Sequence, residues 1–418
     1  MRPARRVGRA TCTNFARSDS AVHILLLNEY YPPDTSATAK MAEMAVEALG
    51  RRHRVTVLAG RPSYDPTERH PYYLLRREVR GNVTVERVGS STYPRFRMRH
   101  RLSNYISYLS LAVPRAMAIR AHVILAMTDP PIAGIAGALV SRLTGRPFVY
   151  NIRDLYPDMA LGGKIVRPSR WVDGWENLHR RALRQAARVI VLGEDMRDRI
   201  ISKGVDPARI AIVRDGAPVP DSVPPATHPA VQEIRCGFPF VVLHAGNLGF
   251  SGAWETLVQA ARLLENDSVG FVFVGEGAVR AQMEASASSC QGVRFLPFRP
   301  PEEVPYVLAA GDLHVVTVRR GLEGVVVPSK LYPILAAGRP VLAVAPEESD
   351  VARIVRREGC GVAADPDDPR AVAEAVRRLR RGPSELADMG RRAREIADNY
   401  DRVKQFEIFT RVVEGVGT

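Results

Sequence analysis

The chain has 418 residues, of which 46% are hydrophobic and 25% are charged. This is the composition of a globular protein of two or three α/β domains, and it excludes a disordered chain, a collagen-like repeat and a small disulfide scaffold. The formal net charge is +14, but residues 1–218 hold 36 Lys and Arg against 19 Asp and Glu, whereas residues 219–418 hold 23 against 26. The N-terminal half is therefore at +17 and the C-terminal half at −3.

Residues 1–20 contain five arginines but no apolar run of the kind found in a signal peptide, so we expect a disordered basic extension. The most apolar stretch, 121–140, is interrupted by Asp129, Pro130 and Pro131, and no transmembrane helix is predicted. The four cysteines form no metal-binding pair, which favours a reducing compartment.

Short β-rich runs alternate with helical patterns through residues 21–217, which is typical of a parallel sheet covered by helices. The predicted strands are Val22–Leu27, Arg54–Leu58, Val83–Val88, Val123–Ala126, Phe148–Asn151 and Val189–Leu192, and the helices include Ala37–Gly50 and Arg170–Ala187. We expect this region to form an N-terminal Rossmann-like domain.

A proline-rich stretch follows over residues 218–236, and we predict a linker that continues neither helix nor sheet. The alternation restarts over 237–399, with predicted strands Phe238–Ala245, Gly270–Val274, Val293–Leu296, Leu313–Val318 and Val341–Val344. Residues 400–418 are expected to form a final helix that could cross back to the N-terminal domain. Two doubly wound domains would then face each other, with ligands at the carboxyl ends of their strands.

The loop after the first strand lacks G-x-G-x-x-G, which counts against a dinucleotide dehydrogenase. Thr35 and Ser36 could present hydroxyls and amides to an anion at the start of the next helix. The alternative, which the spacing alone favours, is that they only cap this helix.

Glycines follow two neighbouring strands of the predicted C-terminal domain. Gly246 and Gly249, with Asn247 between them, could hold a diphosphate through backbone amides, or could simply form a tight turn. Gly275 and Gly277 would line the same cleft.

The segment 327–343 contains the most specific pattern. Ser329 suits the N-cap of a short helix, and Lys330 lies in its first turn. A helix N-terminus is itself positive, so a lysine there favours an anionic ligand over a solvated side chain.

The run PSKLYPILAAGRPVLA, with HAGNLG and VGEG upstream, RDLYPD in the centre and LLLNEYYPPDTSATAKMAEMAVEAL near the N-terminus, resembles family 4 glycosyltransferases. The similarity covers residues 22–400 and is strongest to the branch that builds exopolysaccharide, capsule and O-antigen. It implies an α/β GT-B fold of two Rossmann-like domains, and a retaining transferase.

The resemblance also implies a donor site on the C-terminal domain. Residues expected near the diphosphate and donor sugar are Gly246, Asn247, Gly249, Gly275, Gly277, Ser329, Lys330 and Leu331, with Phe298 and Arg299 facing the base and Thr35 and Ser36 closing from the other domain. Lys330 would neutralise the leaving diphosphate. Relatives have glutamates where this chain has Val325 and Pro333, the second as a ribose clamp; Glu323 could replace the first.

Asp154 follows a predicted strand and should point into the cleft, where a carboxylate could orient or deprotonate the acceptor hydroxyl. The alternative is a turn that closes the loop before Pro157. Asp158 is a second candidate, and His244 is expected to be a core histidine. Because we find no metal-ligand cluster and no DxD-type pair such as metal-dependent transferases use, we expect no metal and no cofactor, with the nucleotide-sugar as substrate.

A basic segment without acidic residues runs from Arg87 to Thr128, and it holds Arg87, Arg95, Arg97, Arg99, Arg101, Arg115 and Arg120. Within it, Leu102, Ile106, Leu109 and Val113 predict an amphipathic helix over 102–119. Such a helix can lie on an anionic membrane. The alternatives are a core helix with solvated arginines in an arginine-rich chain, and nucleic acid, which the lack of a recognised motif disfavours.

These observations favour a cytoplasmic, metal-independent glycosyltransferase of hexosyl or N-acetylhexosaminyl type, either soluble or peripherally bound at the inner face of the cell membrane. It would transfer a sugar from a nucleotide-sugar, expected to be a uridine diphosphate sugar, to a glycan or lipid-linked glycan. A nucleotide-sugar 2-epimerase and a non-catalytic subunit remain as alternatives, the latter favoured by Pro333.

Overall fold

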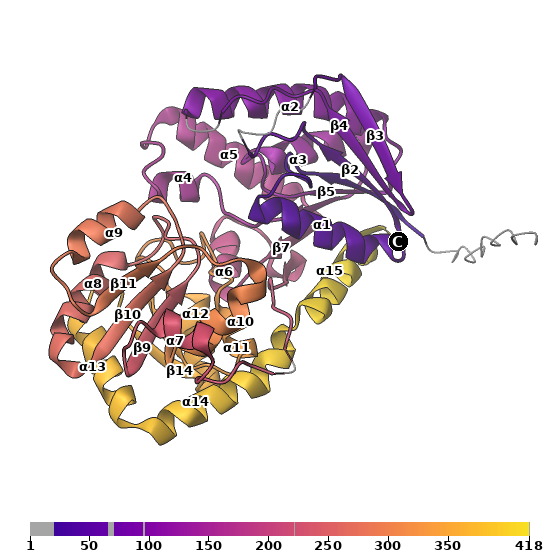
Figure 1. Ribbon diagram of the computed structural model, residues 1–418. Coiled ribbons are helices and arrows are strands. Elements are labelled where there is room, and N and C mark those ends of the chain that lie inside the picture. The colour runs from indigo at the N-terminus through magenta and orange to yellow at the C-terminus, as the bar shows by residue number, and fades with distance from the viewer. Residues whose placement is uncertain (1–20, 66–70, 95–96, 221, 418) are drawn as a thin grey trace, which may run out of the picture.

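The computed structural model describes residues 21–65, 71–94, 97–220 and 222–417, so the expected extension 1–20 lies outside the described residues. The chain forms two α/β halves, each with a central sheet and helices on both faces (Figure 1).

The N-terminal sheet consists, in spatial order, of β3 (Leu75–Arg80), β4 (Val83–Val88), β2 (Arg54–Ala59), β1 (His23–Leu27), β5 (Val123–Ala126), β6 (Phe148–Asn151), β7 (Arg188–Val191) and β8 (Ile210–Ile212). All neighbours are parallel except β3, which runs antiparallel to β4 at the edge. The central strands β1 and β5 are buried along their whole length, as the continuous apolar runs of a covered parallel sheet require.

The C-terminal sheet consists of β11 (Val293–Leu296), β10 (Val269–Val274), β9 (Phe240–Ala245), β12 (Leu313–Thr317), β13 (Val341–Val344) and β14 (Gly361–Ala364), all parallel. The strand order reverses between β9 and β12, because the chain leaves β9 toward one edge and returns on its other side. This reversal is the point at which doubly wound sheets bind ligands, at the carboxyl ends of the strands.

The helices of the N-terminal half are α1 (Ala37–Gly50), α2 (Met98–Ala118), α3 (Ala133–Thr144), α4 (Asp158–Gly162), α5 (Arg170–Gln185) and α6 (Glu194–Ser202). Helix α3 packs against both α2 and α5, so these three form one layer. Among the described residues, no helix is long and apolar enough to cross a membrane.

The helices of the C-terminal half are α7 (Pro229–Arg235), α8 (Trp254–Leu263), α9 (Arg280–Ala287), α10 (Val304–Ala310), α11 (Leu331–Ala336), α12 (Asp350–Glu358), α13 (Pro369–Arg381) and α14 (Pro383–Ile396). Helix α7 lies inside the stretch expected to contain neither helix nor sheet, and that expectation is wrong there. Pro229 occupies the first turn, where no backbone donor is needed, and the ring of His228 caps the helix through the Ala230 N–H.

The last helix, α15 (Arg402–Gly417), crosses back and packs against α1 and β5 of the N-terminal half (Figure 1). Its Phe409 and Val413 are buried in the same apolar cluster as Ile24 of β1 and Val123 of β5. The C-terminal segment is therefore part of the N-terminal core.

The two halves also meet where the N-termini of α6 and α12 face each other. The Asp350 carboxylate accepts a hydrogen bond from the Glu194 N–H at 2.8 Å, and the Asp195 carboxylate accepts one from the Asp350 N–H at 2.9 Å. Arg214 pairs with Asp350 at 2.8 Å. Each half thus supplies a carboxylate to a helix N-terminus of the other, which offsets the repulsion between two positive helix ends.

Candidate active site

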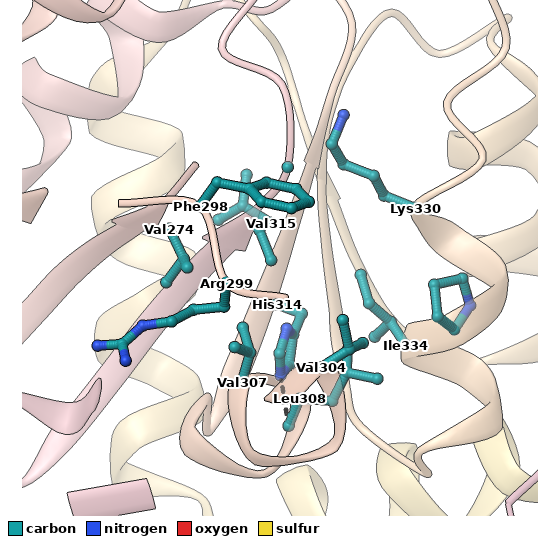
Figure 2. A pocket seen from close by; sticks show the side chains of 13 residues that line it. Val274, Phe298, Arg299, Val304, Val307, Leu308, His314, Val315, Lys330 and Ile334 are labelled. Carbon is teal, nitrogen blue, oxygen red and sulfur yellow. Dashed lines mark hydrogen bonds between the residues drawn. The ribbon is translucent and has the colours of Figure 1, made fainter. Parts of the chain in front are cut away.

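Two cavities of about 150 Å³ each open at the carboxyl end of the C-terminal sheet, and Lys330 lines both. The first is apolar and is lined by Ala245, Gly246, Val274, Phe298, Arg299, Val304, Val307, Leu308, His314, Val315, Lys330, Pro333 and Ile334 (Figure 2). The second is more polar and is lined by His244, Asn247, Ser251, Trp254, Val316, Thr317, Val318, Val326, Val327, Pro328, Ser329 and Lys330.

The Lys330 ammonium has no hydrogen bond or ion pair with any residue that the structure describes. Burial lowers the pKa of this side chain. Gly246, at a φ of +126°, packs so closely on the lysine stem that a Cβ there would lie 2.4 Å from Cε. Packing rather than a counter-charge therefore holds a cation at the junction of the two cavities, which is how an anion site is built.

Ser329 does not cap the helix, and that expectation is wrong. A turn from Pro328 to Leu331 delays the helix by one residue, so that Lys330 occupies the N-cap position without a side-chain cap bond. Ser329 is exposed and lines the second cavity. The Leu331 side chain is buried in the core.

The glycines expected near the donor fall into two groups. Gly246 lines the apolar cavity, and Asn247 lines the polar one. Gly275 and Gly277 pack directly against this loop. A Cβ on Gly275 would lie 2.1 Å from the Gly246 oxygen, and a Cβ on Gly277 would lie 2.3 Å from the Leu248 oxygen. The Gly249 carbonyl accepts a hydrogen bond from the Trp254 indole at 2.5 Å.

Phe298 and Arg299 line the same apolar cavity as Lys330. The Phe298 ring lies over the cavity, across from the Lys330 side chain (Figure 2), and is 64% exposed. The Arg299 guanidinium is paired with Glu233 at 2.7 Å and with Glu303 at 3.2 Å, and it points away from Lys330 (Figure 2).

Glu323 is not among the residues that line either cavity. Its carboxylate accepts from the Gly321 N–H at 2.7 Å, and its carbonyl accepts from Arg199 at 2.7 Å. Val325 is buried, and its carbonyl accepts from the Leu155 N–H at 3.1 Å, so this loop joins the two halves instead.

Ser36 caps α1, and its hydroxyl accepts from the Ala39 N–H at 3.0 Å. Thr35 is exposed, and neither residue lines either of the two cavities. This geometry matches the simple-cap alternative.

Asp154 follows β6 at the carboxyl end of the N-terminal sheet, next to Leu155, which contacts the loop preceding Lys330. Its carboxylate has no hydrogen bond to any described residue, so it does not close the turn before Pro157. Burial and the carboxylate of Asp129 raise the pKa of Asp154 to about 6. By contrast, Asp158 is bound to Lys203 at 2.8 Å and to Arg199 at 3.2 Å.

Asp129 was not predicted to be a site residue. It is the third residue after the end of β5, the strand beside β6, and this position shortly after a buried strand was the available signal.

Thr317 and Ser251 were also missed, and both line the polar cavity. His244, expected in the core, is buried there with its ring 4.8 Å from that of Trp254. Burial and the nearby Lys330 lower the pKa of His244 to about 3, so the ring is neutral. It forms part of the cavity wall.

Two Rossmann-like halves, each with a largely parallel sheet covered by helices, are the architecture of the GT-B class of glycosyltransferases. Residues 36–216 match the family model described as a glycosyl transferase 4-like domain, and residues 239–381 match that of glycosyl transferases group 1. The chain belongs to glycosyltransferase family 4.

The chain is similar to the glycosyltransferase WbjE of Pseudomonas aeruginosa, with 27% identity over 62% of this chain and 66% of WbjE. It is 24% identical to WcaI, a colanic acid biosynthesis glycosyltransferase of Escherichia coli, over 64% of this chain and 68% of WcaI. Anabaena HepE, solved with UDP, superposes with a TM-score of 0.66 at 17% identity over 94% of this chain and all of HepE. The structural similarity confirms the GT-B fold.

Proposed function

We propose that the protein transfers a sugar from a nucleotide-sugar, of the uridine diphosphate type, to a growing surface polysaccharide, with retention of anomeric configuration. The unpaired Lys330 ammonium between an apolar and a polar cavity carries the proposal. A diphosphate beside Lys330 would place the base in the apolar cavity and the donor sugar beside Asn247 and Thr317. Structures of HepE with UDP and with UDP-glucose support this class of donor.

The reaction's main electrostatic task is to stabilise the departing diphosphate, and Lys330 supplies a preorganised cation for it. We include metal independence in the proposal because this ammonium takes the position that a metal ion would otherwise fill. Asp154, on the facing sheet, would orient or deprotonate the acceptor hydroxyl.

The acceptor in this proposal is lipid-linked, and the layer α2–α3–α5 is the surface that meets the cytoplasmic face of the membrane. Leu102 and Ile106 of α2 are 52% and 56% exposed, while the opposite face of α2, at Tyr108 and Ala112, is buried. Trp171 of α5 is 90% exposed in the same layer. Exposed apolar side chains on a basic surface are the combination that binds anionic membranes.

Two arginines of the basic segment are structural. Arg87 is buried and donates to the carbonyl of Tyr31, and Arg115 pairs with Glu86 at 2.6 Å. Arg95 lies outside the described residues. Among the described arginines of this segment, Arg97, Arg99 and Arg120 are exposed, and the membrane proposal depends on this exposed positive charge.

The test is transfer of radiolabelled sugar into a lipid extract, using a panel of nucleotide-sugars with and without EDTA, for the wild type and Lys330→Ala. We expect lipid-bound label with the wild type alone, unaffected by EDTA. A converted sugar nucleotide formed without acceptor would identify an epimerase instead. No transfer and no nucleotide binding would identify a non-catalytic subunit.

A further inference from the structure

Strand β3 leaves one edge of the N-terminal sheet open. It ends the strand order, so none of the strands that the structure describes pairs with its outer side. The other strands that end a sheet, β8, β11 and β14, are buried or half-buried for most of their length, whereas β3 is exposed at every residue except Glu78. An open edge strand can pair with another chain unless a proline, a bulge or a covering element prevents it. β3 contains no proline, and its register with β4 runs unbroken from Leu75 to Arg80.

The backbone groups available at this edge belong to alternate residues. The Gly89 N–H donates to the Leu74 carbonyl at 2.9 Å, and hydrogen-bonded pairs alternate with non-bonded pairs along an antiparallel ladder. The N–H and C=O groups of the even-numbered residues of β3 therefore point toward β4. Those of Leu75, Arg77 and Val79 point outward, so a strand that adds to this edge must pair with these residues.

The side chains of β3 are complementary to those of a second copy of the same strand. Leu75 and Val79 are 46% and 62% exposed, and they lie opposite each other when two copies pair antiparallel about a twofold axis at Arg77. In the same register Arg76 lies opposite Glu78 of the second copy, and opposite charges at this spacing attract. A shift to the next register that pairs outward-facing residues, in either direction, would place Arg76 or Glu78 opposite its own copy, where like charges repel.

Arg77 carries the cost of this register, because it meets its own copy at the twofold axis. Glu86 of β4 lies directly opposite Arg77 in the same chain, 3.8 Å from the guanidinium, and offsets part of the repulsion. By symmetry the favourable apolar and charged pairs each occur on both sides of the axis, whereas the Arg77 contact occurs once. The self-paired register is therefore favourable as a whole.

We propose that the protein forms a twofold-symmetric dimer, in which the β3 strands of two copies pair antiparallel and join the N-terminal sheets into one continuous sheet. The strand pair uses the outward backbone groups of Leu75, Arg77 and Val79 from each copy. Because one pair of short strands buries a small area, we expect a Kd in the micromolar range.

The dimer would place both membrane-facing layers on one side, a consequence that rests on the proposed function. Arg77 lies on the face of the sheet that carries α2, because its neighbour Glu86 also pairs with Arg115 of α2. The twofold axis of an antiparallel strand pair is perpendicular to the sheet, so it keeps this face of both copies on the same side. The two α2–α3–α5 layers would then meet one membrane, and two linked contacts bind more tightly than one.

Sedimentation velocity of the full chain, at low salt and without donor, acceptor or vesicles, tests the proposal. We expect a dimer whose fraction rises between about 1 and 100 µM. Arg77→Pro removes an outward N–H without touching the ladder to β4, and proline is tolerated at such edge positions, so this variant should stay monomeric. Arg391→Glu, at an exposed arginine of α14, is the control and should dimerise as the wild type does.

A wild type that is monomeric at about 100 µM, or a dimer that survives Arg77→Pro, overturns the inference. Both results leave the proposed function intact, since none of these measurements involves sugar transfer or nucleotide binding.

Charge reversal tests the partner and the register together. Arg76→Glu places acidic residues opposite each other on both sides of the axis, and Glu78→Arg does the same with arginines. Each variant alone should dimerise about tenfold or more weakly than the wild type. The two variants are complementary to each other, so an equimolar mixture should form a mixed dimer with a Kd within about threefold of the wild-type value. Absence of the mixed dimer from folded variants, or full dimerisation of either variant alone, overturns the inference.

A gain of affinity provides the last test. Arg77→Thr removes the like charge at the axis, and Glu86 keeps Arg115 as its partner. We expect the dimer of this variant to be about two- to fivefold tighter than that of the wild type. An unchanged or weaker dimer would show that Arg77 does not lie at the axis, and would overturn the inference.

Discussion

The two halves share one architecture but carry opposite unpaired charges at the carboxyl ends of their sheets. The C-terminal half has a net charge of −3, yet its sheet edge holds the Lys330 cation; the N-terminal half is at +17, yet its edge holds Asp154 beside Asp129. In each half the charge at the site is opposite in sign to the charge of the half. Surface charges are screened within about 10 Å by salt, whereas partly buried ones are not, so placement rather than net charge determines the chemistry of the cleft.

Removing the carboxylate should have the largest effect. Asp154→Asn is expected to lower turnover by about 10²- to 10⁴-fold, the usual contribution of a positioned acid or base, with little change in the Kd of the donor nucleotide. Steady-state kinetics measures the loss of turnover, and calorimetry measures the Kd of the donor nucleotide. Asp158→Asn is the matched control, because that carboxylate is already ion-paired. Full activity of Asp154→Asn would show that Asp154 does not orient or deprotonate the acceptor hydroxyl.

The same carboxylate should make turnover depend on pH. Because the pKa of Asp154 is raised to about 6, the charged form that acts on the acceptor disappears as the pH falls through 6. We expect turnover to decline below about pH 6 in the wild type, and that decline to be absent from the residual activity of Asp154→Asn. A rate that is flat between pH 5 and 7 would contradict this.

Removing the cation should affect the donor side alone. Lys330→Met keeps the stem that packs on Gly246 but loses the charge, and we expect nucleotide diphosphates to bind about 30- to 100-fold more weakly. The free energy of unfolding should not fall, since an unpaired, partly buried ammonium is removed. Lys404→Met, at a lysine paired with Asp398 on the surface, is the control. Unchanged nucleotide affinity would place the diphosphate elsewhere.

The proposed membrane surface lies on the N-terminal half, and it can be altered without changing Lys330 or Asp154. Leu102→Glu with Ile106→Glu should reduce co-sedimentation with phosphatidylserine vesicles by about tenfold, because two apolar contacts are lost and two negative charges are added. Val403→Glu, at an exposed valine on α15, is the control. An equal loss of vesicle binding in both variants would argue against the α2–α3–α5 layer as the membrane-binding surface.

The smallest expected effect concerns the contact between α6 and α12. Burial raises the pKa of Asp195 to about 6, so the folded state binds its proton more readily than the unfolded state, and stability from this group is lost as the pH rises from about 4 to 6. Asp195→Asn keeps an acceptor for the Asp350 N–H without the charge. Compared with the wild type, we expect its free energy of unfolding to be higher by roughly 1 kcal/mol more at pH 7.5 than at pH 4.5, as measured by urea titration. Asp195→Ala, which also loses the acceptor, should be destabilised at both pH values.

The sequence predicted the buried strands of both sheets well, because continuous apolar runs mark a covered parallel strand. It did not predict β3, whose residues are mostly charged, because this edge strand is held by pairing with β4 rather than by burial. The edge strands β8 and β14 are mostly half-buried, so neither carries the continuous buried apolar run that marks a central strand.

For the candidate site, the sequence singled out Lys330 because a lysine conflicts with a helix N-terminus unless an anion is present, and its contact with a diphosphate stays a prediction. The polar cavity was not, because Thr317 and Ser251 reach it only through the pairing of β12 with β9, which no local pattern encodes. Asp129 likewise depends on the adjacency of β5 and β6.

The path of α15 has a consequence for how the protein is made. Ribosomes synthesise chains from the N-terminus, and domains generally fold in that order. Here the N-terminal domain is completed only once α15 has been synthesised, because Phe409 and Val413 complete the apolar cluster around β1 and β5. Until then, the sheet face that α15 covers is open to chaperones and to aggregation. A truncation that removes α15 would therefore destabilise the N-terminal half, which is the half that is translated first.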